Sequence, residues 1–183
     1  MRQAEILKGE RVYLRFYTAA DSPFVQALLA DPEIARFYLP GLPRPYAPDQ
    51  VTAELNTWHG ENEAYLFAIV DRADESVIGL ANLDQVDLFN RNAEVGIGLA
   101  AAGRRRSGLG QEALTLLIDY AFYYMNMHRL YARVIDGNQA SLRLFKKLGF
   151  SVEGRLRAQV FRNGLYLDMH MFGLLEKEWS GCA

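Results

Sequence analysis

Cysteine is almost absent from this sequence. The single cysteine among the 183 residues is Cys182, in the terminal segment Ser180–Ala183. One cysteine can form neither an internal disulfide framework nor a cysteine-rich metal site. The three histidines, His59, His128 and His170, are not spaced as metal ligands either. We therefore expect no metal centre, and the low cysteine content suits a reducing compartment such as the cytoplasm.

The sequence also lacks an excess of either charge and any long hydrophobic run. Twenty Lys and Arg residues stand against 22 Asp and Glu residues, a formal charge of -2, so the chain has no overall positive field of the kind that non-specific nucleic-acid binding requires. No apolar run approaches the length of a membrane span, and the start, MRQAEILKGE, has no apolar signal-peptide core. We expect a cytoplasmic protein with neither nucleic acid nor membrane as partner.

What is present is enough apolar sequence for one core. Half of the residues are apolar, and internal repeats and low-complexity tracts are missing. A chain of this length can bury one sizeable core but is short for two domains. We therefore predict a single domain over residues 1–183.

The first third of the chain has strand and helix signals in turn. We predict a strand over Val12–Phe16, a helix capped by Asp21 that runs to about Leu29, a helical piece near Glu33–Tyr38, and a helix over Asp49–Trp58. The segment Leu39–Pro48 between the last two is proline-rich, and proline is incompatible with a helix interior or a central strand. This segment is predicted to be a loop.

The remainder predicts a meander followed by helices and a hairpin. Three β-rich runs, over residues 65–71, 76–87 and 93–99, are separated by polar turns, as in an antiparallel meander. We then expect a long helix with an apolar face at Ala113, Leu114, Leu117, Ile118, Ala121, Phe122 and Met125, a strand over 130–135, a short helix over 138–150 ending at Gly149, and a hairpin closed by Asn163-Gly164. The predicted fold is α/β (α+β): a twisted, mixed and mostly antiparallel sheet of about seven strands with helices on both faces.

Three arginines and two glycines stand at the start of the long helix. Arg104, Arg105 and Arg106 precede Gly108 and Gly110. A helix N-terminus has free N–H groups and the positive end of the helix dipole, glycine lets the backbone approach a ligand closely, and arginine adds bidentate donors. The combination is typical of a phosphate or pyrophosphate site, although the same residues could form an ordinary solvated loop before a helix.

Three phosphate-binding patterns compete for these residues. The spacing from Gly103 to Gly108 is that of a nucleotide-triphosphatase loop, but Leu109 and Gly110 occupy the positions of its lysine and its Ser/Thr, which excludes it. Gly108, Gly110 and Ala113 fit the GxGxxA dinucleotide pattern, with Asp136 as a ribose acceptor, but the preceding strand does not run directly into the glycines. The third pattern is RxxGxG.

In that third pattern the sequence resembles the GNAT superfamily of N-acetyltransferases, whose signature is [Q/R]xxGx[G/A]. EVGIGL is similar to the bulged strand that precedes the signature in that family, and Asn138 to Phe150 is similar to its NxxS…KxGF region. The segments GERVYLR and GFSVEGRLRAQVFRNGLYLDMHMFGLLEKEW resemble the branch with ribosomal-protein N-terminal and spermidine N-acetyltransferases. The resemblance covers nearly the whole chain.

The resemblance implies transfer of an acetyl group from acetyl-CoA, the co-substrate, to a primary amine by direct attack in a ternary complex, without a metal. The residues implied in acetyl-CoA binding are Ile97, Gly98, Leu99, Arg104, Arg105, Arg106, Ser107, Gly108, Leu109, Gly110, Asn138, Ser141, Phe145 and Lys147. A main-chain N–H in a bulge at Gly96–Leu99 is the candidate to polarise the thioester carbonyl.

Glu94 is the candidate catalytic base, because it lies on the central strand just before the expected bulge. An equally weighted alternative is a structural carboxylate that caps a turn or pairs with Arg91. Spermidine-type enzymes have a tyrosine acid where this chain has Phe145, and although Tyr131 and Tyr166 are substitutes to consider, no acid is assigned.

The identity of the acceptor amine is the property that the sequence determines least. By resemblance it enters near Glu33, Tyr38 and the loop that contains Tyr46. The segment Leu39–Pro48 contains Arg44 and no acidic residue, whereas a polyamine site needs clustered carboxylates, so a protein N-terminus or a small amine is favoured. A homodimer is allowed by the sequence. The alternatives are a degenerate acyl-CoA-binding module and an NAD-binding protein.

Overall fold

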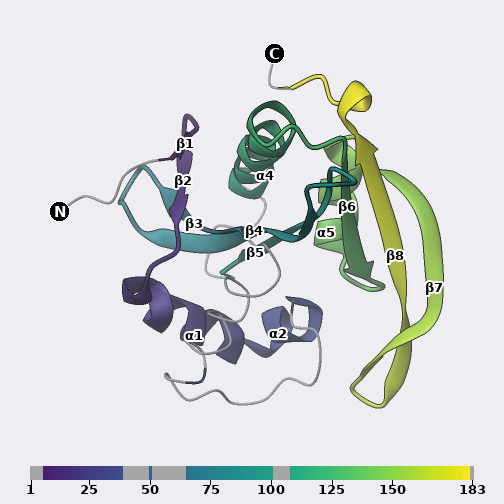
Figure 1. Ribbon diagram of the computed structural model, residues 1–183. Coiled ribbons are helices and arrows are strands. Elements are labelled where there is room, and N and C mark those ends of the chain that lie inside the picture. The colour runs from purple at the N-terminus through teal and green to yellow at the C-terminus, as the bar shows by residue number, and fades with distance from the viewer. Residues whose placement is uncertain (1–5, 39–49, 51–64, 101–107, 182–183) are drawn as a thin grey trace.

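A computed structural model of the chain describes residues 6–38, 50, 65–100 and 108–181 (Figure 1). The strands in these ranges are β1 (Leu7–Lys8), β2 (Val12–Phe16), β3 (Tyr65–Asp71), β4 (Val77–Asp87), β5 (Asn92–Leu99), β6 (Arg129–Ile135), β7 (Ser151–Arg162) and β8 (Leu165–Leu175). The helices are α1 (Ser22–Ala30), α2 (Pro32–Tyr38), α4 (Leu109–Asp119) and α5 (Gln139–Lys147), with a π-helical turn over Tyr120–Tyr124 and 3-10 turns over Ala19–Asp21 and Glu176–Glu178.

The strands form one sheet in the order β1-β2-β3-β4-β5-β6-β8-β7. Neighbours pair antiparallel except β5 and β6, which are parallel. The prediction of a mixed, mostly antiparallel sheet is confirmed. The count of about seven strands was one short, because β1 is only two residues long and its sequence contains no alternation that could reveal it.

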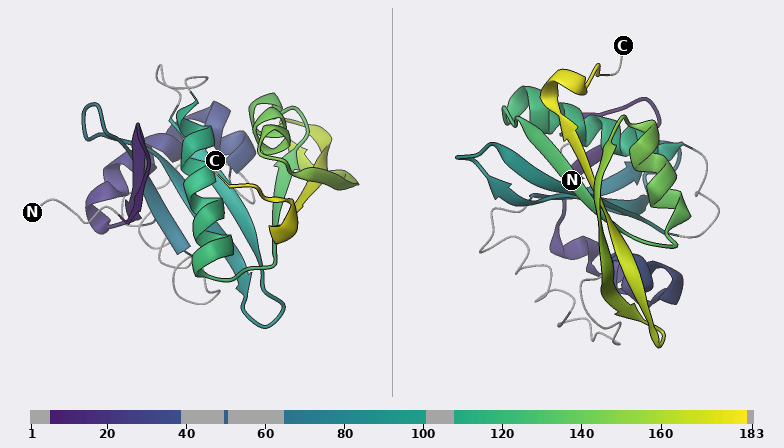
Figure 2. Two further views of the ribbon diagram at one scale, coloured as in Figure 1. Left: turned by 90° about the horizontal axis from the view of Figure 1, so that it is seen from above. Right: turned by 90° about the vertical axis from the view of Figure 1, so that its right-hand side faces the viewer.

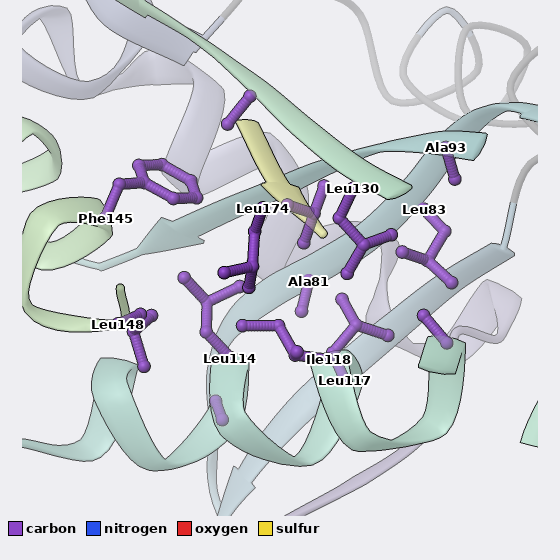
Figure 3. Close-up of a cluster of buried hydrophobic side chains, with 14 of the residues drawn as sticks. Ala81, Leu83, Ala93, Leu114, Leu117, Ile118, Leu130, Phe145, Leu148 and Leu174 are labelled. Carbon is purple, nitrogen blue, oxygen red and sulfur yellow. The ribbon is translucent and has the colours of Figure 1, made fainter. Parts of the chain in front are cut away.

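Helices cover both faces of the sheet, as predicted. Figures 1 and 2 show α1 and α2 on one face and α4 on the other. Side chains alternate between the faces of a strand, so Val95 of β5 packs toward α4 while Leu80 of β4 packs toward α1. Six of the seven residues predicted for the apolar face of the long helix are at most 2% exposed: Ala113, Leu114, Leu117, Ile118, Ala121 and Phe122. The seventh, Met125, follows the π-helical turn and is only partly buried. Figure 3 shows part of this core, where Leu114, Leu117 and Ile118 meet side chains of β4, β6 and β8.

A buried ion pair fixes α1 to the sheet. Both terminal nitrogens of Arg15 on β2 donate to the carboxylate of Asp21, at 2.8 and 2.7 Å, and Asp21 also accepts from the N–H of Thr18. The expected helix cap at Asp21 is therefore only half right. Asp21 occupies the N-cap position of α1, but its carboxylate makes no side-chain cap bond and binds Arg15 instead.

The two predicted glycine turns are also present. Asn163 and Gly164 both have positive φ, 52° and 80°, as the type I′ turn between β7 and β8 requires. Gly149 ends the α5 region at φ 87°. The resulting β7–β8 hairpin is long and extends past α2 (Figures 1 and 2), where the Nε of Arg162 donates to the carbonyl of Arg36. No helix in the described ranges is long and apolar enough to cross a membrane.

Candidate active site

The candidate site begins where β5 and β6 separate. These two parallel strands pair over three residues only, from Asn92 opposite Arg129 to Glu94 opposite Tyr131. Beyond Glu94 the strands diverge, and Figure 1 shows β5 and β6 spreading apart toward their C-terminal ends. The pairing of β5 with β4 continues to Leu99. We call the opening between β5 and β6 after Glu94 the fork.

Backbone groups of β5 face the fork. The N–H of Ala100 donates to the carbonyl of Ile78, at 3.0 Å, on the β4 side. Backbone groups alternate in direction along a strand, so the continuous register places the N–H and C=O groups of Val95, Ile97 and Leu99 on the fork side. An extended ligand with amide groups can pair with such an edge as an added strand does.

The bulge expected at Gly96–Leu99 is not found in the pairing with β4. The register is continuous from Glu94 to Leu99, and the irregularity lies between Asp84 and Asp87 of β4, where Gln85 has φ 50°. That expectation was wrong in its position. The opening arises instead because β6 leaves β5.

The N-terminus of α4 lies beside the end of β5. Gly108 is the N-cap residue, with φ 86° in the left-handed region that favours glycine. The first N–H groups after it have no partner inside the helix. A Cβ built on Gly110 would lie 2.8 Å from Cδ1 of Leu99, so the helix packs on β5 at this point. These contacts place the positive end of α4 next to the fork.

Gly110 packs directly against β5. A side chain at this position would point to Leu99, so we expect Gly110→Leu to overpack the contact between α4 and β5 and cost roughly 1–3 kcal/mol. Gly110→Ala, whose Cβ would meet the side-chain ends of Leu99 and Ile97 at 2.8 and 3.6 Å, should remain closer to the parent. Thermal melting of the two variants tests this, and a Leu variant as stable as the Ala variant would contradict the packing shown here.

Arg11, which the sequence patterns did not single out, lies at the same helix start. Its Nη2 is 3.1 Å from a Cβ built on Gly108. Glu112, in the first turn of α4, accepts from the Nε of Arg11 at 2.9 Å and from the main-chain N–H groups of Arg11 and Val12 at 2.7 and 3.2 Å. Burial opposes ionisation of Glu112, but these hydrogen bonds hold its pKa below the usual range. Glu112 thus holds the half-exposed guanidinium of Arg11 against Gly108.

Glu94 lies at the base of the fork, and its partner is Arg133. The Nε of Arg133 donates to both carboxylate oxygens, at 2.9 and 3.0 Å, and Nη2 lies 2.7 Å from Oε2. This hydrogen-bonded pair raises the pKa of Arg133. The alternative of a pair with Arg91 was wrong, because Arg91 binds Asn126 and approaches Glu176. Arg133 is 39 residues from Glu94 in sequence, and only the β5–β6 pairing brings them together.

Two further polar residues stand beside Glu94. Asp84 on β4 and Tyr131 on β6 are its direct cross-strand neighbours, so all three side chains emerge on the face of α1 and α2. Burial, and then the negative charge of Glu94, raise the pKa of Tyr131, so its hydroxyl stays protonated. Tyr166 is different: it is 69% exposed and packs against Phe161 with tilted rings near the hairpin turn.

Two predicted acetyl-CoA residues in the α5 region, Asn138 and Phe145, make contacts within the fold. Asn138 caps α5 by accepting from the N–H of Ser141 at 3.2 Å. The ring of Phe145 is 4% exposed and packs on Phe150 and Phe172, as Figure 3 shows for its place in the core. Lys147 is exposed in the last turn, at the opposite end of α5 from Asn138. Contacts with acetyl-CoA stay predictions for Asn138, Ser141, Phe145 and Lys147.

Several predicted site residues lie outside the described part of the chain. These are Arg104, Arg105, Arg106, Ser107 and Tyr46. Glu33 and Tyr38 belong to α2, whose end lies near the turn after β6, because a Cβ on Gly137 would be 4.0 Å from the ring of Phe37. Ile97, Gly98, Leu99, Leu109 and Gly110 are brought together at the fork and the start of α4.

The alternative of a dinucleotide-binding fold does not match the topology. Such a fold needs consecutive parallel strands, and in the described sheet only β5 and β6 pair in parallel. The proposed ribose acceptor, Asp136, approaches Nε2 of His170 at 3.3 Å and Arg155 at 3.9 Å. Across the described residues, no group of three His, Cys, Asp or Glu side chains is arranged to hold a metal ion.

Comparison with known proteins agrees with this geometry. The acetyltransferase (GNAT) domain matches residues 11–151. An uncharacterized N-acetyltransferase, p20, of Bacillus licheniformis is 33% identical over 181 residues, 97% of this chain and 99% of p20. The spermidine N(1)-acetyltransferase of Vibrio cholerae is 26% identical over 171 residues, 93% of this chain and 96% of that enzyme.

A solved structure is similar over almost the same length. The crystal structure of spermidine N-acetyltransferase from Vibrio cholerae in complex with CoA and spermine superposes with a TM-score of 0.83 at 25% identity, covering 93% of this chain and 98% of that one. The family match spans well over half of the residues, and it includes β5, the fork and the start of α4. The chain belongs to the GNAT family of N-acetyltransferases.

Proposed function

We propose that this protein transfers the acetyl group of acetyl-CoA to a primary amine, with the pantetheine arm in the fork and the pyrophosphate at the start of α4. The observation that supports this most is the position of the positive end of α4 directly beside an open strand edge. CoA has both matching parts, a pyrophosphate and an extended arm with two amides. When bound, acetyl-CoA supplies the activated acyl group.

The fork side of β5 is suited to hold the thioester. The N–H groups of Val95, Ile97 and Leu99 face the fork, and one of them can donate to the carbonyl oxygen as negative charge develops there. Glu94, on the face opposite α4, can accept a proton from the amine directly or through a water. Tyr131 is the cross-strand neighbour of Glu94 on β6, and its hydroxyl can donate a proton to the departing sulfur.

The charge of Arg11 is expected to strengthen the phosphate site. We expect Arg11→Ala to raise the KM for acetyl-CoA about 3- to 10-fold with little change in kcat, because a charge-assisted contact is lost at an exposed site. Arg91→Ala is the matched control, since Arg91 is also half-exposed but binds Asn126 beyond the other end of α4. Steady-state kinetics that show equal KM values for both variants would remove Arg11 from the site.

A thiol-release assay tests the proposed function. With acetyl-CoA and a panel of amines (spermidine, short peptides with free N-termini and small monoamines), we expect CoA release that depends on one class of amine. Melting of the protein with CoA or NAD provides the second readout, since a ligand at a hundred times its Kd stabilises by about 2.7 kcal/mol. Protection by NAD and none by CoA would refute the proposal. Protection by CoA without turnover on any amine would favour the degenerate binding module.

A further inference from the structure

We propose that the acceptor is a small zwitterionic amine, one whose amino group is accompanied by a carboxylate, and that Arg133 binds this carboxylate. This inference rests on the proposed function, since it concerns the acceptor side of the same site. Charged side chains of β4, β5 and β6 lie together on the sheet face that α1 and α2 cover.

One terminal nitrogen of the Arg133 guanidinium, Nη1, takes no part in the bonds to Glu94. The bonds of Arg133 to Glu94 employ Nε and Nη2, and Nη1 has no partner among the residues that the structure describes. The side chain is 47% exposed, although Glu94 beside it is only 15% exposed. Arginine binds carboxylates through paired N–H groups in a fixed plane, so Nη1 together with Nη2 can still receive an anion from solvent.

Arg129 provides a contrast on the same strand. It lies on the same face as Arg133, four residues earlier, but both of its terminal nitrogens are bonded to Glu153. Its carboxylate-binding edge is therefore filled by the protein itself. The bonds of Arg129 to Glu153 are those of a structural ion pair. The bonds of Arg133 to Glu94 leave the Nη1 side of the Arg133 guanidinium open at the fork.

The carboxylates that can bind the ammonium group of the acceptor lie on β4 and β5, on the other side of Glu94 from Arg133 or at Glu94 itself. Asp84 lies directly across from Glu94, and its carboxylate accepts from the N–H of Gln85, at 2.8 Å. Across the three strands the order is therefore Asp84, Glu94 and Arg133. An amino group near the two carboxylates and a carboxylate near Arg133 complement this order, whereas a polyamine would place a second positive charge beside Arg133.

Matched pairs of acceptors test the proposal. Glycine, 3-aminopropanoate and 4-aminobutanoate are each compared with their carboxamides in the thiol-release assay, at rates expressed per concentration of unprotonated amine. We expect kcat/KM for the best acid to exceed that for its amide about 10-fold or more, as the loss of a charge-assisted contact predicts. In Arg133→Met this preference should disappear, chiefly through a higher KM for the acid, while Arg129→Met should keep it.

Each other outcome counts against the proposal. Amides used as well as acids, or an Arg133→Met variant that slows both members of a pair equally, would make Arg133 a structural partner of Glu94 only. CoA binding in the melting assay without turnover of any pair would refute the zwitterionic acceptor and leave the CoA site intact. Absence of CoA binding would instead refute the proposed function itself.

Discussion

Glu94→Gln is expected to lower turnover by about 10²-fold or more and to leave the affinity for CoA nearly unchanged. A positioned proton acceptor contributes on this scale, and a glutamine cannot take the proton from the amine. The amide oxygen can still accept from Arg133, so the contact between β5 and β6 is partly kept. Turnover per folded molecule and CoA affinity should be measured on one preparation.

The matched control is Glu176→Gln. Glu176 is also a carboxylate near an arginine, 3.9 Å from Arg91, but it lies in the exposed turn after β8, so its removal should leave turnover unchanged. A Glu94→Gln variant that melts at a lower temperature but turns over normally would assign Glu94 a structural role. The ion pair with Arg133 would then be its whole function.

Asp21→Asn is expected to have the largest effect on stability, about 3–5 kcal/mol, which corresponds to a melting temperature lower by roughly 10 °C. Asp21 is 5% exposed and Arg15 9%, and the variant leaves the guanidinium buried without a countercharge. Glu153→Gln breaks the partly exposed pair with Arg129 and should cost no more than about 1 kcal/mol. Equal losses in the two variants would contradict the burial described here.

The same pair should determine part of the acid sensitivity. Burial works against the charge of Asp21, but hydrogen bonds from Arg15 and Thr18 hold its pKa below the ordinary value of 3.8. A lowered carboxyl pKa adds stability above the unfolded value, and that stability is lost as the pH falls through the folded value. Denaturant unfolding from pH 6 to pH 3 should therefore show a steeper decline for the parent than for Asp21→Asn. Equally steep declines in the stability of the parent and of Asp21→Asn would contradict this role of the pair.

Local signals were sufficient for most of the fold. The continuous run of aromatic and β-branched residues over 65–71 and the Asn163-Gly164 turn each specify a strand or a hairpin through nearest neighbours alone. The apolar spacing after Gly108 specifies which face of α4 is buried. These patterns were predictable because each depends on residues within one or two turns of the chain.

The site depends on contacts that no local pattern contains. Glu94 meets Arg133 only because β5 and β6 are parallel in one particular register, and Arg11 reaches Gly108 only because Glu112 binds the turn before β2. The position of the expected bulge at Gly96–Leu99 also came from resemblance, and the pairing with β4 places the irregularity elsewhere. Sequence reasoning found the helix start and the base candidate, and missed the two arginines that accompany them.

Amide hydrogen exchange with and without saturating CoA tests the central claim, that CoA binds between the fork and the start of α4, most directly. We expect slower exchange in peptides covering Val95–Leu99 and Leu109–Glu112, where backbone N–H groups would pair with the ligand, and no change in the β7–β8 turn around Asn163-Gly164. Binding of CoA with unchanged exchange in both segments, or with protection confined to other elements, would contradict the account.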